Sequence, residues 1–303
     1  MPGAIYSGEG GTGPAMPRCD GMSSHMPLWL LVNGTSGSHQ QGRIEMLRER
    51  LSLSGRGPDR ILDCQTDGMP DRAALEGAGV GTLAVHGGDG TINGAVTNVE
   101  GWDGQLLPLP GGTANLLCHR LYTDVDLERI VAQFTAGNLS RRRIGCVCCD
   151  KGLALSEMLL GPGAKWADVR EDMRGYDIGK FVEDALDAAG QSVNGPMVRL
   201  VRPALGKAAG YSGVRLVPRV DDFAVEGYGP ETLADFLAQG AAVIARNFRE
   251  GPHETLACVD TLDCETEGGA PIAMMMDGER CEADSPVTLW HRQLDLDILG
   301  ERA

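Results

Sequence analysis

From residue 28 to about residue 137, short apolar runs alternate with stretches of helical periodicity. The apolar runs predict strands at residues 28–32, 60–64, 80–85 and 105–109. Between residues 127 and 134, apolar residues recur at positions i, i+3, i+4 and i+7, which places them on one face of a helix. Strands that alternate with helices in this way predict a doubly wound parallel sheet.

After residue 140 the pattern changes to a series of short β-rich runs. These predict an antiparallel β-sandwich, interrupted by helical faces at residues 178–189 and 232–247. The runs are residues 144–149, 153–160, 197–201, 214–217, 254–264, 271–276 and 286–299.

The change of pattern predicts two domains. We expect an α/β domain over residues 27–140 and a β-sandwich domain over residues 141–303, with the functional site in the cleft between them. Residues 1–26 are rich in Gly, Ser, Pro and Met and show no periodicity, so we expect a disordered tail there.

Composition narrows the class of partner. The chain has 27 Lys and Arg against 42 Asp and Glu, and the net charge of −15 argues against binding nucleic acid. No apolar run reaches the roughly 18 residues of a transmembrane segment. Nine cysteines without paired spacing, and no signal-peptide pattern, favour a cytoplasmic protein. Any contact with the inner membrane surface would then be peripheral.

Two glycine-rich turns follow predicted strands. They are Gly-Gly-Asp-Gly-Thr at residues 87–91 and Pro-Gly-Gly-Thr-Ala-Asn at residues 110–115. A turn of this kind that opens a helix presents backbone N–H groups to a phosphate. Asp89 is suited to the site if a Mg²⁺ ion lies between its carboxylate and the phosphate. The simpler alternative is two tight connections within a doubly wound sheet.

Four stretches together resemble the diacylglycerol kinase catalytic domain family, which bacterial lipid kinases, sphingosine kinases and ceramide kinases share. They are residues 30–37 (Leu-Leu-Val-Asn-Gly-Thr-Ser-Gly), 87–91, 110–115 and 277–279 (Asp-Gly-Glu). The run at 87–91 alone is similar to NAD kinases and 6-phosphofructokinases. Asp-Gly-Glu favours the lipid branch, so the resemblance implies an ATP- and Mg²⁺-dependent kinase that phosphorylates a lipid hydroxyl at the membrane surface.

The resemblance also implies roles for particular residues. Asp89 would organise Mg²⁺, and Glu279 would accept the proton of the lipid hydroxyl. The residues expected to bind the nucleotide are Asn33, Ser36, Gly37, Thr66, Gly87, Gly88, Gly90, Thr91, Gly112, Thr113 and Asn115.

Several alternatives stay open. Taken alone, residues 277–279 could be a hairpin turn with Glu279 in solvent. Leu116 stands where many bacterial relatives carry Asp, so a metal-linked carboxylate is missing there. A soluble nucleotide kinase of the NAD-kinase type and a nucleotide-binding regulatory module without turnover are the rival functions. The lipid, the nucleotide preference and the oligomeric state, a homodimer included, are not determined.

Overall fold

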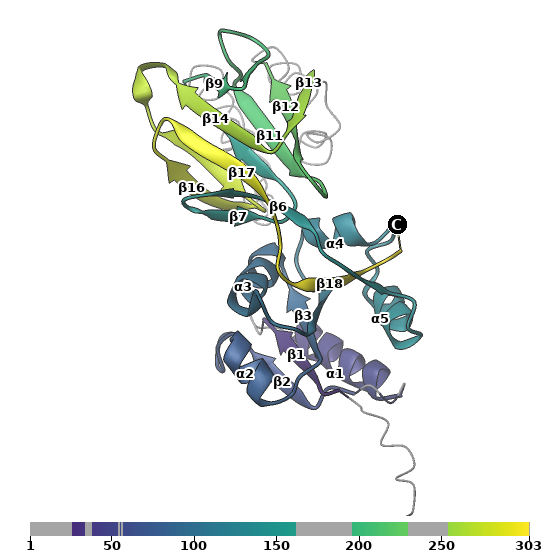
Figure 1. Cartoon of the computed structure of the whole chain (residues 1–303). Coiled ribbons are helices and arrows are strands. Elements are labelled where there is room, and N and C mark those ends of the chain that lie inside the picture. The colour runs from purple at the N-terminus through teal and green to yellow at the C-terminus, as the bar shows by residue number, and fades with distance from the viewer. Residues whose placement is uncertain are drawn as a thin grey trace, which may run out of the picture.

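The computed structural model describes residues 26–33, 38–53, 55, 57–161, 196–229 and 254–302. Residues 1–25 of the expected tail at 1–26, Ser36, Gly37 and the helices expected at 178–189 and 232–247 lie outside these residues. The described chain forms one body with a six-stranded sheet and helices, and a second body with two further six-stranded sheets (Figure 1).

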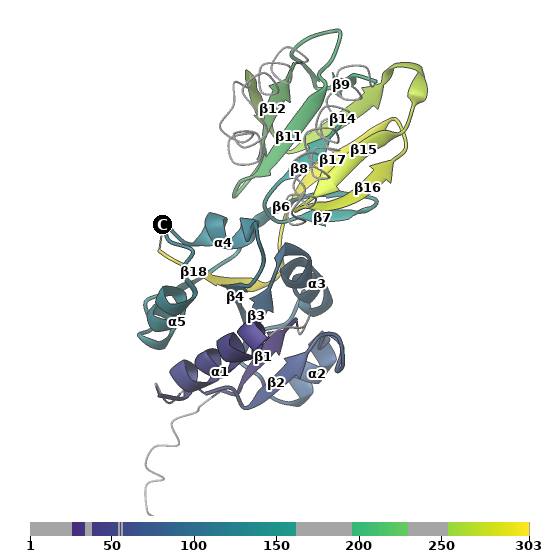
Figure 2. The same cartoon turned by 180° about the vertical axis from the view of Figure 1, so that it is seen from behind.

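The first body is built on sheet A, whose strand order is β2-β1-β3-β4-β18-β5. Strands β1 to β4 are parallel, and α1 and α5 lie on one side of them with α2 and α3 on the other (Figures 1 and 2). The elements are β1 (Leu28–Val32), α1 (Ser38–Leu53), β2 (Arg60–Asp63), α2 (Arg72–Gly77), β3 (Thr82–Gly87), α3 (Asp89–Val99), β4 (Gln105–Pro110), α4 (Leu116–Leu121), α5 (Leu127–Thr135), β5 (Ser140–Arg142) and β18 (Asp297–Gly300).

Burial on both faces explains the sequence of the central strands. Every residue of β1 and β3 is buried, as expected for parallel strands covered by helices on each side. The face of α5 that carries Ile130, Val131 and Phe134 packs into the same core. The predicted doubly wound sheet and the predicted helix at 127–134 are therefore confirmed.

The second body is a sandwich of two antiparallel sheets. Sheet B has the order β10-β9-β14-β17-β6-β7 and sheet C the order β13-β12-β11-β8-β15-β16. The strands are β6 (Gly145–Cys149), β7 (Gly152–Ala154), β8 (Met158–Leu160), β9 (Val198–Arg202), β10 (Ala204–Leu205), β11 (Gly213–Pro218), β12 (Phe223–Tyr228), β13 (Glu254–Val259), β14 (Thr261–Thr266), β15 (Ile272–Met276), β16 (Glu279–Ala283) and β17 (Val287–Gln293), with a 3-10 turn at Glu267–Gly269.

Side chains from both sheets fill one core between them. Val147 and Leu262 of sheet B pack in the same buried cluster as Leu160, Val214 and Met274 of sheet C. The expected β-sandwich is confirmed. Among the described residues, no helix is long and apolar enough to cross a membrane.

Two of the predicted β-rich runs are each divided between sheets. Residues 254–264 contain β13 of sheet C and the start of β14 of sheet B, and residues 286–299 contain β17 of sheet B and most of β18 of sheet A. Each run therefore changes sheets partway along. Because β18 pairs with β4 and β5, the last strand of the β-sandwich domain expected over residues 141–303 lies in sheet A.

This return of the chain makes β18 part of the first body's core, where Ile298 is fully buried. We expect Ile298→Ala to lower the free energy of unfolding by roughly 2–5 kcal/mol, because it leaves a cavity in a packed core. Denaturant unfolding checks this. Val220→Ala, at a side chain that is 58% exposed, is the matched control and should change stability by less than about 0.5 kcal/mol. A similar small loss for Ile298→Ala would show that β18 is dispensable.

Candidate functional site

The carboxyl ends of three parallel strands meet at one edge of sheet A. His86 of β3 pairs with Leu109 of β4 on one side and with Val32 of β1 on the other. The residues that follow these strands, including Asn33 and both glycine-rich turns, therefore share the same edge. In open α/β sheets this edge is where ligands bind.

The two glycine-rich turns touch through their backbones. A Cβ atom on Gly112 would lie 2.6 Å from the Cα of Gly88, and a Cβ on Gly111 would lie 2.8 Å from the backbone nitrogen of Gly87. Side chains at Gly111 and Gly112 would force the turns apart. The two hydrogen bonds between the side chain of Asn115 and the backbone of Gly112, 2.9 and 3.0 Å long, close the second turn.

Asp89, at the start of α3, joins the first turn to α4. Its Oδ1 atom accepts hydrogen bonds from the backbone N–H of Leu116 at 2.5 Å and of Leu117 at 3.4 Å. The side chain thus satisfies two amides at the beginning of α4, which Asn115, in the left-handed region, does not cap with its own side chain. This capping role was not expected from the sequence.

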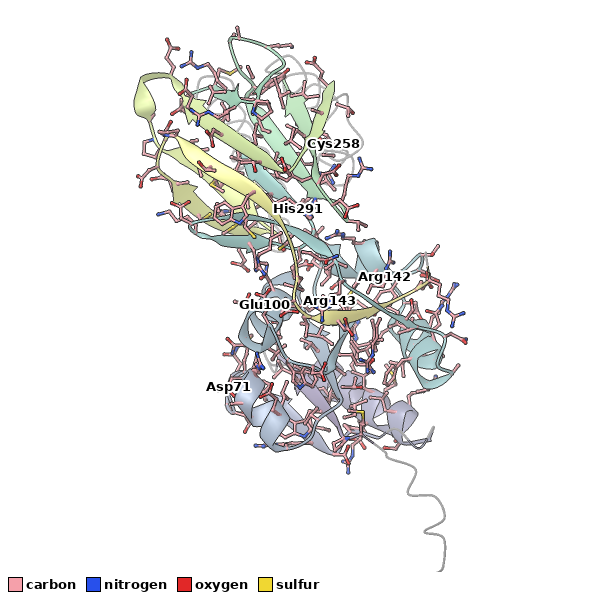
Figure 3. All side chains as sticks on the ribbon, viewed as in Figure 1. Asp71, Glu100, Arg142, Arg143, Cys258 and His291 are labelled. Atoms are coloured by element: carbon pink, nitrogen blue, oxygen red, sulfur yellow. The ribbon has the colours of Figure 1, made fainter. Side chains whose placement is uncertain are left out.

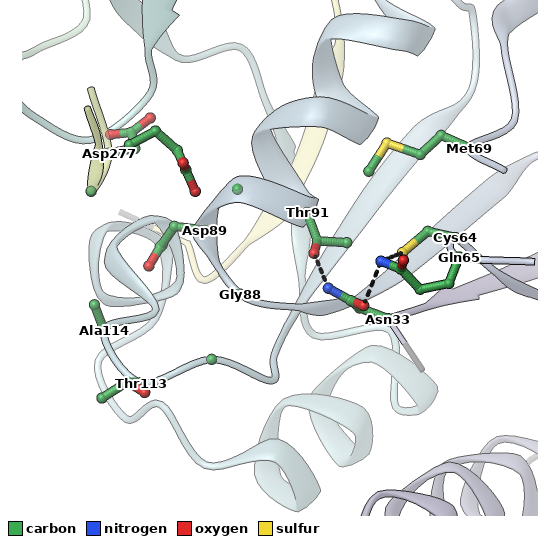
Figure 4. Close-up of a pocket in the computed structure, with 14 residues that line it drawn as sticks. Asn33, Cys64, Gln65, Met69, Gly88, Asp89, Thr91, Thr113, Ala114 and Asp277 are labelled. Atoms are coloured by element: carbon green, nitrogen blue, oxygen red, sulfur yellow. Dashed lines mark hydrogen bonds between the residues drawn. The ribbon is translucent and has the colours of Figure 1, made fainter. Parts of the chain in front are cut away.

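Polar side chains at the ends of β1 and β2 are linked by hydrogen bonds to the start of α3. The side-chain amide of Asn33 donates to Thr91 Oγ1 at 2.9 Å, and Gln65 donates to Asn33 Oδ1 at 3.3 Å (Figure 4). These bonds join the ends of β1 and β2 to the first turn of α3.

Glu279 reaches the site from the second body. Its Oε1 atom lies 2.6 Å from the position that a Cβ atom on Gly90 would take, so the carboxylate sits against the first turn of α3. The turn before it joins β15 to β16, with Met276 paired to Glu279. Asp277 and Gly278, its two central residues, have φ values of 48° and 93°, which suits a tight hairpin turn.

Asp277 is buried beside Glu279 and is fully engaged. Its carboxylate accepts backbone hydrogen bonds from Leu155, Ser156 and Glu157 at 2.6–3.0 Å, and one from the side chain of Asn93 at 3.0 Å. Burial raises the pKa of Asp277 to about 6, while the three backbone donors lower it and repulsion from Asp89 adds to the rise. The hydrogen bonds therefore offset only part of the cost of burial.

These residues surround a pocket of about 410 Å³, within the size range of small-molecule sites. Its wall includes eight expected residues. They are Asn33, Gly88, Asp89, Gly90, Thr91, Gly112, Thr113 and Glu279.

Gly87 and Asn115 belong to the two turns but do not line the pocket, and Ser36 and Gly37 are outside the described residues. Thr66 does not line the pocket, whereas Cys64 and Gln65 just before it do. The role of Thr66 as a nucleotide contact stays a prediction.

The sequence analysis missed several lining residues. They are Cys64, Gln65, Met69, Ala114, Asp277 and Gly278. Asp277 and Gly278 were recognised only as parts of a motif and given no role. Cys64 and Gln65 follow a predicted strand, and their position at the same sheet edge was the signal that could have identified them.

The pocket suits a phosphate chain with one divalent cation. Bare glycines let the backbone approach phosphate oxygens, and α3 begins at Asp89 without a side-chain cap. Among the described residues, no group of three or more His, Cys, Asp or Glu side chains could hold a metal ion. Mg²⁺ is commonly held by one or two carboxylates with phosphate oxygens and water, and Asp89 supplies one carboxylate here.

Residues 27–147 match the family model of the diacylglycerol kinase catalytic domain. This match confirms the resemblance on which the sequence interpretation rested. It covers the first body without β18 and the beginning of the second. A search of the curated proteins gives no significant match.

Solved structures share the whole two-part fold. A crystal structure titled as a diacylglycerol kinase from Bacillus anthracis str. Sterne matches with a TM-score of 0.63 and 14% identity, over 91% of this chain and 97% of that one. Yeast NADH kinase complexed with NADH gives a TM-score of 0.48 and 9% identity, over 92% and 85% of the two chains. At these identities the first likeness shows the fold alone, and the second is too weak to support an argument.

The raised pKa of the buried Asp277 carboxyl predicts how the free energy of unfolding depends on pH. A raised pKa means that the stability from protonating Asp277 is fully present below its unfolded value, near 3.8, and is lost as the pH rises through about 6. Asp277→Asn does not titrate in this range. Between pH 4 and pH 7 the wild type should therefore lose roughly 2 kcal/mol of unfolding free energy relative to Asp277→Asn. Denaturant unfolding of both proteins across this range measures the difference. A difference that does not change with pH would contradict the shifted pKa.

Proposed function

We propose that this chain is an ATP- and Mg²⁺-dependent kinase that phosphorylates the hydroxyl group of a lipid. The observation that carries the proposal is the contact between Glu279 and the first turn of α3. It puts a carboxylate from the second body next to a glycine-rich turn suited to phosphate. Phosphoryl transfer requires these two features together, because the accepting hydroxyl must be held beside the phosphate that it attacks.

The two glycine-rich turns would hold the phosphates of the nucleotide. The backbone N–H groups at Gly90, Thr91 and Thr113 are the candidate donors, with those at Gly90 and Thr91 supported by the dipole of α3. Asn33 and Gln65 would contact the part of the nucleotide that lies toward β1 and β2. This assignment follows from their place on the pocket wall.

Asp89 would hold Mg²⁺ through its carboxylate while keeping the hydrogen bonds that cap α4. The metal, when bound, neutralises charge on the phosphates that Asp89 alone could only repel. The carboxylate is fixed by two backbone donors, so it needs little reorganisation to take this role.

Glu279 would act as the general base. Its carboxylate takes the proton of the lipid hydroxyl as the oxygen of that hydroxyl forms a bond to the γ-phosphorus and the bond from this phosphorus to the β–γ bridging oxygen breaks. The lipid as acceptor rests on the family match of residues 27–147 and on Asp-Gly-Glu, and the pocket itself does not select it.

A direct test is a screen for transfer of radiolabelled γ-phosphate. The acceptors are diacylglycerol, monoacylglycerol, phosphatidylglycerol, sphingosine and ceramide in mixed micelles, with NAD as a soluble acceptor. Transfer to a lipid supports the proposal and names the substrate. Transfer to NAD only would favour a soluble nucleotide kinase, and nucleotide binding without any transfer would favour a regulatory module.

Asp89→Asn separates the metal role from the capping role. The amide oxygen can still accept the N–H of Leu116, so the fold should be retained, but a neutral amide binds Mg²⁺ weakly. We expect transfer to fall by at least about a hundredfold, with thermal unfolding little changed. Asp103→Asn, at an exposed residue of the same body, is the matched control. Near-normal transfer by folded Asp89→Asn would refute the metal assignment.

Glu279→Gln should suppress transfer and leave the binding of Mg²⁺-ATP intact. Glutamine keeps the shape of the side chain but cannot take the hydroxyl proton, so the expected loss is about a hundred- to ten-thousandfold. Calorimetry measures ATP binding and the transfer assay measures turnover. Glu282→Gln, at an exposed residue on the same strand, should behave as wild type. If Glu279→Gln keeps full turnover, the Asp-Gly-Glu turn is an ordinary hairpin.

A further inference from the structure

Segments that lie far apart in the sequence meet at the carboxylate of Asp277. Asn93, on α3 of the first body, donates to its Oδ2 atom at 3.0 Å. The backbone of residues 155–157, which we call the β7–β8 turn, donates to both oxygens, from Leu155 at 2.6 Å, Ser156 at 2.8 Å and Glu157 at 3.0 Å. Asp277 also donates its own N–H to the carbonyl of Glu157 at 3.0 Å. The carboxylate is thus bonded to both bodies at once.

The β7–β8 turn is also held from its other side. Arg120, on α4, donates to the carbonyl of Leu155 and, at 2.8 Å, to the carbonyl of Gly145. Since α4 begins at the amides that Asp89 caps, the hydrogen bonds form a closed ring. The ring runs from Asp89 through α4 and the β7–β8 turn to Asp277, and returns through Asn93 to α3.

The ring surrounds the place where Glu279 meets α3. Asp277 and Gly278 form the two-residue turn, and Glu279 follows it directly. The backbone position of Glu279 is therefore determined by that of Asp277. Asn93 lies on the same helix as Gly90, one turn further along, and Gly90 is the residue that the Glu279 carboxylate contacts. Loss of the bond between Asn93 and Asp277 would therefore release Glu279 from the phosphate turn.

We infer that Asp277 is a positioning residue, which with Asn93 holds Glu279 against the glycine-rich turn at the start of α3. The consequence for turnover rests on the proposed kinase function, whereas the structural restraint does not. Four donors from the protein engage both oxygens of the Asp277 carboxylate. We therefore assign its effect to the position of Glu279.

A contact between the bodies that lies away from the ring supplies a matched control. Glu100 lies at the other end of α3 (Figure 3). It pairs with Arg292 of β17 and accepts the N–H of Asp295 at 3.2 Å. Glu100→Gln weakens the contact between the bodies without touching the ring at Asp277. If the effect came from a general loosening of the contact between the bodies, Glu100→Gln would show it too. If it came from loss of the position of Glu279, Glu100→Gln would not show it.

The test compares Asn93→Ala, Asp277→Asn and Glu100→Gln in the full chain. Asn93 is half-buried, so its truncation should fold even if Asp277→Asn does not. Hydrogen exchange, read by mass spectrometry, follows the amides of the β7–β8 turn. We expect exchange there to accelerate by about tenfold or more in Asn93→Ala and Asp277→Asn, and to stay unchanged in Glu100→Gln.

Kinetics supply the readout that a merely structural role would not change. With a confirmed lipid acceptor, kcat should fall by about tenfold or more in Asn93→Ala, with KM for ATP within about twofold of wild type. In the background of Glu279→Gln, the Asn93→Ala change should cost nothing further, because the group that it positions is already gone. The inference would be overturned if the losses of kcat from Asn93→Ala and Glu279→Gln multiplied in the double variant. A wild-type kcat in Asn93→Ala would overturn it as well.

The two proposals fail in different ways. If the wild type transfers phosphate to no lipid while exchange at the β7–β8 turn depends on Asn93, the kinase function fails and the restraint stands. If transfer occurs but neither variant changes exchange at this turn, the restraint is wrong and the kinase function stands.

Discussion

The close approach of two backbones at Gly88 and Gly112 is the constraint on which the rest of the site depends. There is no room for a Cβ atom on Gly112, and the approach is possible because β3 and β4 end in register. It sets the distance from α3 to α4 and so allows Asp89 to cap the second helix. A pocket walled by two backbone turns results from packing alone, before any ligand is considered.

The sequence pattern predicted the elements that depend only on the residues within them. The strand at 28–32 and the helix at 127–134 were predicted because buried runs and helical periodicity need no knowledge of partners. The run at 286–299 is predicted as one β-rich segment, yet β17 joins sheet B and β18 joins sheet A. Only pairing with distant strands distinguishes these halves, so the sequence pattern could not separate them.

The same limit applies to the site. Its glycine turns and Asp-Gly-Glu were recognisable because each is a compact motif. The hydrogen bonds of Asp89 to α4, and of Asp277 to Asn93 and the β7–β8 turn, link residues 27 to 184 positions apart. No periodicity reports such contacts. Gln65 was missed in favour of its neighbour Thr66, because the loop after β2 carries no pattern that fixes which residue turns inward.

The position of β18 has a consequence for how the molecule is made. In sheet A, β4 lies between β3 and β18. The strand β18, which covers one edge of β4, is synthesised only after the strands of both antiparallel sheets. Until then the growing chain presents the unpaired backbone of β4, which is a template for pairing with other chains. The first body therefore cannot be completed from the N-terminus onward, and its exposed edge is an aggregation hazard during translation that a chaperone could relieve.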